Sequence, residues 1–128
     1  MAEGIKDGMI RRLTGQDYEA FVRQKQAAAV HFDAAWDVEY KPIAHRSMSK
    51  AAEVLAEHVN FGEVDCDREV ELAKSIRVLN VPTVAYYLNG DLVGVLGGAQ
   101  NILGRLERLL RGEQIGYNDG LNGDDANC

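Results

Sequence analysis

The chain has 128 residues, of which 46% are hydrophobic and 27% are charged, and its formal net charge is -6. These values suit one globular domain that can bury a core without metal or disulfide staples. They argue against nucleic-acid binding, because acidic residues run along the whole chain and the most basic stretch, Arg105 to Arg111, is typical of a solvated helix face. No stretch approaches the roughly 18 apolar residues of a membrane span. We therefore expect neither nucleic acid nor a membrane as a partner.

Cysteine usage indicates the cellular compartment. Cys66 and Cys128 are the only two cysteines, and they lie far apart in the sequence. They define no disulfide framework, so a reduced, cytoplasmic protein is the simpler expectation. Residues 1–8 are charged and lack the apolar stretch of a secretory signal, and we expect them to form a flexible N-terminus.

The first half of the chain alternates between strand and helix patterns. A short strand is predicted over residues 9–13, and a helix follows it to about residue 26, with Thr14 and Asp17 as a capping box. The apolar run over residues 27–32 predicts a buried strand, and residues 33–40 a loop. A second helix is marked by apolar residues spaced three and four apart, with Pro42 in its first turn. These apolar residues are Met48, Ala51, Ala52, Leu55 and Val59.

The second half adds a hairpin and a final helix. A strand is predicted over residues 61–64 and a short helix over residues 68–75. Asn89-Gly90 joins two further strands, over residues 83–88 and 92–96, and is a strong hairpin signal. The last helix carries its apolar face on Ile102, Leu103, Leu106, Leu109 and Leu110.

This order of elements predicts an α/β fold. Alternating strands and helices give a parallel part of the sheet, and the hairpin makes the sheet mixed, with helices on both faces. We assign the folded domain to residues 9–112. Residues 113–128 are dominated by Gly, Asn and Asp, so we expect a disordered acidic tail that can be removed without loss of stability.

Four short motifs then resemble those of a known family. Val30–Lys41 reads VHFDAAWDVEYK and is similar to the thioredoxin stretch in which a buried strand leads into Trp-Cys-Gly-Pro-Cys-Lys. Val81-Pro82-Thr83 resembles the cis-proline loop of thioredoxins, Leu88–Asp91 their hairpin, and Gly98-Ala99 the glycine that follows it. In this order and spacing, the motifs imply a three-layer thioredoxin-like fold with a cis bond before Pro82.

The resemblance fails at the two reactive cysteines. Asp37 and Tyr40 stand where thioredoxins have their thiols, with Val38 and Glu39 between them; Trp36 and Lys41 flank the motif as in the family. Neither a carboxylate nor a phenol can carry out thiol–disulfide exchange. We therefore expect no catalytic residue and no cofactor. The resemblance then implies a redox-inactive protein-binding module, such as an adaptor, an assembly factor or a chaperone-like protein.

A second departure concerns a buried charge pair. Thioredoxins place an Asp in the strand before the motif, opposite a Lys on the neighbouring strand, and the matching residues here are His31 and Glu63. Exchanging acid and base would keep the site paired. Alternatively, a neutral His31 bonds to the backbone and Glu63 reaches solvent.

The resemblance also implies a binding groove. The loop over residues 36–41, the loop over residues 81–83 and the turn at Gly97-Gly98 should meet at one end of the sheet. Trp36, Val38 and Tyr40 would then be apolar anchors, and Asp37 and Glu39 an acidic rim. We expect the partner to be a protein or an extended peptide segment, and the acidic rim favours one that carries Lys or Arg.

Two other functions stay open at this stage. The chain could be an atypical thiol–disulfide oxidoreductase that relies on Cys66, or a structural subunit of a larger complex. A metal site is not expected at the loop acids Asp33, Asp37 and Glu39, with His45 nearby, because they form no EF-hand pattern and water usually solvates acids in such a loop.

Overall fold

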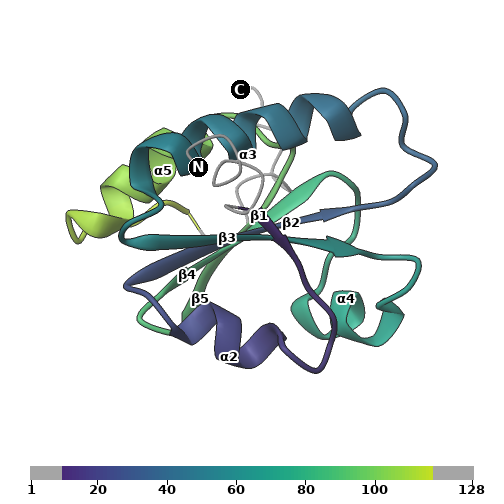
Figure 1. The fold of residues 1–128 in the computed structure, drawn as a ribbon, viewed down its shortest axis with the longest axis horizontal. Coiled ribbons are helices and arrows are strands. Elements are labelled where there is room, and N and C mark those ends of the chain that lie inside the picture. Colours follow the sequence, from purple (N-terminus) through teal and green to yellow (C-terminus); the bar gives the residue numbers. More distant parts are fainter. Residues whose placement is uncertain (1–9, 117–128) are drawn as a thin grey trace, which may run out of the picture.

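The computed structural model describes residues 10–116, which form a three-layer α/β domain. Figure 1 shows helices α3 and α5 on one face of the central sheet and helices α2 and α4 on the other. In chain order the elements are β1 (Ile10–Arg12), α2 (Tyr18–Arg23), β2 (Ala27–Asp33), α3 (Lys41–Leu55), β3 (Val59–Asp65), α4 (Val70–Ile76), β4 (Thr83–Leu88), β5 (Asp91–Gly97) and α5 (Ile102–Leu110).

The sheet is mixed, as the sequence predicts. Its strand order is β1-β3-β2-β4-β5. Strand β3 runs parallel to both β1 and β2, whereas β4 is antiparallel to β2 and β5 is antiparallel to β4. The hairpin between β4 and β5 turns at Asn89 and Gly90, whose φ angles of 53° and 87° are both positive, as a tight two-residue hairpin requires.

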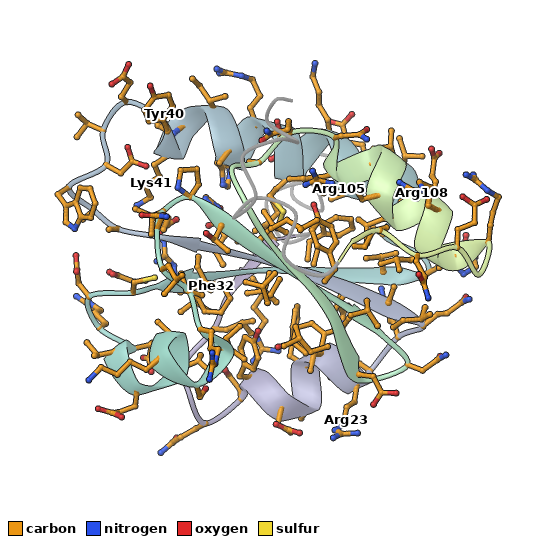
Figure 2. The ribbon with its side chains drawn as sticks, turned by 180° about the vertical axis from the view of Figure 1, so that it is seen from behind. Arg23, Phe32, Tyr40, Lys41, Arg105 and Arg108 are labelled. Carbon is orange, nitrogen blue, oxygen red and sulfur yellow. The ribbon has the colours of Figure 1, made fainter. Side chains whose placement is uncertain are left out.

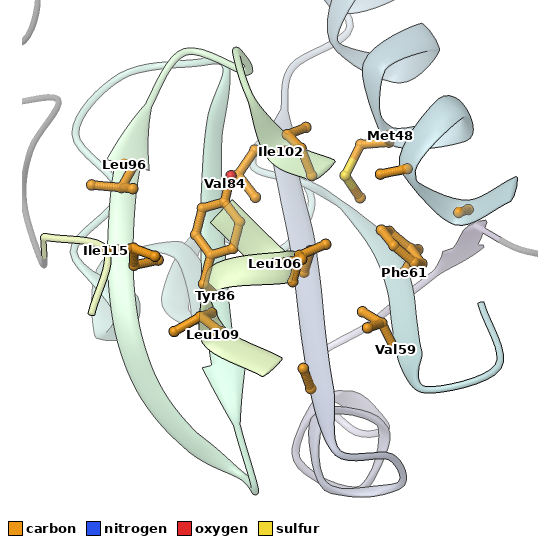
Figure 3. Close-up of a cluster of buried hydrophobic side chains, with 14 residues drawn as sticks. Met48, Val59, Phe61, Val84, Tyr86, Leu96, Ile102, Leu106, Leu109 and Ile115 are labelled. Atoms are coloured by element: carbon orange, nitrogen blue, oxygen red, sulfur yellow. The ribbon is translucent and has the colours of Figure 1, made fainter. Parts of the chain in front are cut away.

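Strand β2 lies in the middle of the sheet and is buried on both faces. Ala27 and Ala29 point into the core beneath α3 and α5, whereas Ala28, Val30 and Phe32 point into the core above α2 and α4. This is the period-two alternation of a strand, and the small alanine side chains let both helical layers pack against it. Figure 3 shows the core on the α3 and α5 side, centred on Tyr86, Leu106 and Phe61.

Some element boundaries differ from the sequence prediction. Helix α2 begins later than expected because Thr14 and Asp17 close a turn ahead of it, in which the Asp17 carboxylate accepts the Thr14 N–H at 2.8 Å, and it ends at Arg23 instead of about residue 26. Val59, which the spacing assigned to the second helix, is the first residue of β3. Helix α4 begins at Val70 instead of residue 68. Met9 and residues 1–8 lie outside the described part of the chain.

The packed chain continues beyond the predicted end of the domain at residue 112. Ile115 is only 5% exposed, and Figure 3 shows it beside Leu96 and Tyr86, where it closes the core next to α5. An isolated isoleucine in a polar segment gives no periodic signal, so the sequence pattern could not place it in the core. The rest of the predicted tail, residues 117–128, lies outside the described residues. Within residues 10–116, no helix has the length and apolar character that crossing a bilayer would demand.

The burial of Ile115 generates the first prediction. Replacing Ile115 by Ala should lower the free energy of unfolding by about 2–5 kcal/mol, because it removes buried methyl groups and leaves a cavity. The matched control is Val54→Ala, since Val54 is 59% exposed on α3 and its loss should cost less than about 0.5 kcal/mol. Urea denaturation of the full chain measures both, and equal stabilities of the two variants would contradict the packing described here.

Candidate functional site

The loop between β2 and α3 carries the residues that replace the two thiols. Tyr40 is 53% exposed and immediately precedes the first residue of α3. Asp37 is only 7% exposed, and its carboxylate accepts the Tyr40 N–H at 3.1 Å, which ties the loop to the start of the helix. The expectation that Asp37 forms part of an acidic rim is therefore wrong, because helix entry draws this carboxylate inward. Glu39 remains exposed.

The second part of the site is the loop that precedes β4. The Val81–Pro82 bond is cis, as the sequence resemblance implies. The carbonyl of Pro82 accepts the N–H of Gly98 at 2.7 Å, and Thr83 pairs with Gly97 in the sheet. Gly98 has a φ of 80°, a backbone conformation that side chains disfavour. The proline loop and the glycine turn are thus held together by the backbone.

An open groove with a volume of about 480 Å³ lies between these loops. Figure 2 shows Tyr40 and Lys41 at the start of α3, far from Arg108 on α5. The residues that line the groove are Tyr40, Ile43, Ala44, Ser47, Val81, Pro82, Gly98, Ala99 and Gln100. Helix residues 43, 44 and 47 were absent from the predicted site, although their spacing of three and four along α3 would have placed them on one face.

Two predicted anchors lie beside the groove and not in its lining. Trp36 is 68% exposed and Val38 is 80% exposed on the loop. Both side chains are therefore open to contact by a partner molecule. Tyr40 is the predicted anchor that does line the groove.

A buried polar cluster lies beneath α3, at the end of β2. His31 and Glu63 are register partners on adjacent strands, and His31 Nδ1 lies 3.5 Å from Glu63 Oε2. His45 on α3 makes a shorter hydrogen bond to the same oxygen, 2.5 Å long, and Arg12 lies 4.0 Å from the other carboxylate oxygen. His31 and Glu63 therefore lie within reach of each other, and His45, which stays exposed on α3, is a further partner of Glu63 that the sequence pattern did not indicate.

Asp33 belongs to the same cluster. It is fully buried, and its Oδ2 lies 3.8 Å from His31 Nδ1. Strand alternation places residues 31 and 33 on one face of β2, but the sequence prediction ended this strand at residue 32 and left Asp33 in the loop. A predicted strand that extended to residue 33 would have placed Asp33 in this cluster.

The two buried carboxyl groups respond differently to their surroundings. Burial raises the pKa of Asp33, an effect that the neighbouring charges of His31 and Lys41 offset only in part. Burial would also raise the pKa of Glu63, but hydrogen bonds from His31 and His45 outweigh it and hold this pKa at about 2. Glu63 is therefore ionised at neutral pH, and its charge depends on both histidines.

Cys66 does not belong to the groove. It follows β3, its backbone N–H donates to the Asp33 carbonyl at 2.8 Å, and its side chain is partly buried. Burial, reinforced by the negative charges of Asp33, Asp65 and Asp67, raises the pKa of its thiol to about 11. A thiol with such a pKa is poorly nucleophilic at neutral pH.

Comparison with known proteins identifies the family. The Thioredoxin family model matches residues 9–110, so the chain belongs to the thioredoxin family. It is 29% identical over 114 residues to mouse thioredoxin domain-containing protein 2, covering 84% of this chain and 21% of that protein. It is 28% identical over 88 residues to protein disulfide-isomerase of Aspergillus oryzae, covering 69% of this chain and 17% of that protein. The chain thus spans about a fifth of the length of these relatives.

Solved structures share the fold at low identity. Oxidised mitochondrial thioredoxin 3 of Saccharomyces cerevisiae superposes with a TM-score of 0.69 at 22% identity, covering 84% of this chain and 98% of the yeast chain. Oxidised thioredoxin of Plasmodium falciparum gives a TM-score of 0.66 at 20% identity, covering 80% and 96% of the two chains. At this level of identity the likeness establishes the thioredoxin fold.

The raised pKa of Cys66 generates the second prediction. A shift from the ordinary value of 9.0 to about 11 leaves about a hundredfold less thiolate at pH 7. Iodoacetamide should therefore alkylate Cys66 slowly at pH 7, and the rate should rise with pH until the thiol ionises near pH 11. Mass spectrometry of the Cys66 peptide measures the rate, and Cys66→Ser identifies signal from Cys128. A rate that levels off below pH 9 would contradict the burial argument.

Proposed function

We propose that this chain is a redox-inactive member of the thioredoxin family that binds an extended segment of a partner protein. The observation that carries the proposal is the groove itself: it is formed, open and mainly apolar, although both thiol positions hold other residues. Loss of the thiols removes the exchange chemistry and leaves the surface on which a chain segment can lie.

The shape of the groove fits an extended segment. One wall is the exposed side of α3 with Tyr40 and Ile43, and the other is the proline loop with Val81. The residue before the proline offers its backbone to an incoming chain, as an edge strand does, while pockets between side chains select the residues of the segment.

The lining also indicates the chemistry of the partner segment. With Asp37 buried, Glu39 is the remaining exposed acid of the predicted rim, so charge selection for Lys or Arg is weaker than the sequence suggests. Apolar side chains of the partner would contact Tyr40, Ile43 and Pro82, and the neighbouring Trp36 could extend the contact. We therefore propose a partner segment that is extended and apolar, with basic residues as a secondary preference.

The competing enzymatic function has little support. An oxidoreductase that relies on Cys66 would need a reactive thiolate near the groove, whereas this thiol is partly buried, has a raised pKa and is not among the groove residues. A structural subunit of a larger complex would hold its partner permanently. Reversible binding of a short peptide segment would distinguish an adaptor from such a structural subunit.

A peptide titration tests the groove. Linear peptides selected from a displayed library against the full chain are titrated into the protein, and binding is followed by the fluorescence of Trp36, the single tryptophan. Tyr40→Ala should weaken binding by about 1–3 kcal/mol if Tyr40 is an anchor. Val54→Ala is the matched control, because Val54 is a similarly exposed apolar residue of α3 outside the groove lining.

Two results would overturn the proposal. One is a library that yields no linear binder. The other is a set of binders that Val54→Ala weakens as much as Tyr40→Ala does, which would place binding on a different surface of α3.

A further inference from the structure

The buried cluster beneath α3 brings two carboxyl groups and an imidazole together. His31, Asp33 and Glu63 each direct one ligand-type atom into a common space, and these atoms all lie within 4.8 Å of one another. All three residues are buried. The cluster is separate from the groove, since none of the three lines it.

Asp33 is the unexplained member of this cluster. Its side chain is 0% exposed, and neither oxygen accepts a hydrogen bond from any residue in the described range 10–116. Its Oδ2 lies 3.8 Å from His31 Nδ1, beyond hydrogen-bond range. A buried carboxylate without hydrogen bonds is costly unless a cation or a metal compensates it. The arrangement therefore points to a ligand for Asp33.

The distances within the cluster suit a metal ion. His31 Nδ1 lies 3.5 Å from Glu63 Oε2, a long hydrogen bond, and 3.8 Å from Asp33 Oδ2, beyond hydrogen-bond range. In a tetrahedral zinc site with bonds of about 2.0–2.1 Å, ligand atoms lie roughly 3.3 Å apart. His31 Nε2 has no partner within residues 10–116, so the polar contacts of this imidazole run through Nδ1, the atom that faces the carboxylates.

We propose that His31, Asp33 and Glu63 bind a divalent transition-metal ion of the Zn²⁺ class. Two carboxylates neutralise the charge of the ion, and an imidazole nitrogen favours zinc over the oxygen-seeking Mg²⁺ and Ca²⁺. In the sequence, Asp33 stands next to the loop acids Asp37 and Glu39, and that grouping predicts no metal site. The fold separates these acids and brings Asp33 together with two strand residues instead.

The His45 side chain lies at the entrance to the proposed metal site, and its imidazole is the proposed fourth ligand. Its side chain is 52% exposed on α3, and its Nδ1 lies 2.5 Å from Glu63 Oε2. Two ligands of one zinc ion cannot lie this close, so the imidazole rotates away from Glu63 to complete the coordination shell of the ion.

The positive groups facing the cluster are Arg12, 52% exposed and 4.0 Å from Glu63, and Lys41, which lowers the pKa of Asp33 through its charge. Both side chains are long enough to turn toward water when the ion enters.

Zinc titration of the full chain tests the site. After dialysis against a chelator, the protein is titrated with ZnCl₂ in competition with a chromophoric chelator. We expect one bound equivalent, and Asp33→Asn and Glu63→Gln should each weaken binding by at least about tenfold. His58→Ala and Cys66→Ser are the controls and should bind like the unsubstituted chain, because His58 is 59% exposed and pairs with Glu57 outside the cluster, and Cys66 is not a ligand.

A second measurement keeps the test decisive if a variant fails to fold. The chain has three histidines, so NMR of the unsubstituted protein resolves three imidazole signals, and zinc should shift those of His31 and His45 while that of His58 stays in place. Four outcomes overturn the proposal: no zinc binding, zinc binding lost in Cys66→Ser, binding unchanged in Asp33→Asn and Glu63→Gln, or an unmoved His31 signal.

Discussion

Strand β2 has neither a free edge nor an exposed face. Its seven residues are all buried, and its backbone pairs with β3 on one side and with β4 on the other. A strand in this place must offer side chains that two helical layers can cover, and its alanines let α3 and α5 approach from one side and α2 and α4 from the other. Two loops at the candidate site are positioned by this strand. The loop that replaces the thiol motif begins where β2 ends, and the proline loop leads into β4 beside it.

The same burial explains why the polar residues of β2 occur as a cluster. His31 and Asp33 lie in this buried layer. Glu63 is within hydrogen-bond distance of His31, and His45 bonds to the same carboxylate, whereas Asp33 has no hydrogen-bond partner among residues 10–116. At the adjacent loop, Asp37 takes a structural role at a former thiol position. Its carboxylate accepts an N–H ahead of α3, and negative charge at that end of a helix is favourable. The backbone around the site is thus held in place by side chains that cannot carry out thiol–disulfide exchange.

Much of the fold could be predicted from periodicity, because the alternation along β2 and the Asn89-Gly90 turn are local signals that the tertiary structure reinforces. The misplaced residues depended on contacts distant in sequence. Ile115 is buried by α5 and β5, and a lone apolar residue in a polar segment gives no pattern. His45 is exposed on α3 as expected, but its contact with Glu63 was not predicted, because only the register of β2 and β3 places Glu63 beneath it. His31 and Glu63 could be predicted because the family motif relates these two positions to each other. Asp33 was missed because the predicted strand ended one residue too early.

The central claim is that this chain keeps the thioredoxin frame and lacks its chemistry, and reduction of insulin disulfides by dithiothreitol tests it most directly. The unsubstituted chain should accelerate the reaction no more than a buffer control does. The double variant Asp37→Cys, Tyr40→Cys restores a thiol at each position of the motif at the start of α3, and it should accelerate the reaction measurably. Turnover by the unsubstituted chain that disappears in Cys66→Ser would contradict the account, because it would make this protein an oxidoreductase that uses a thiol outside the groove.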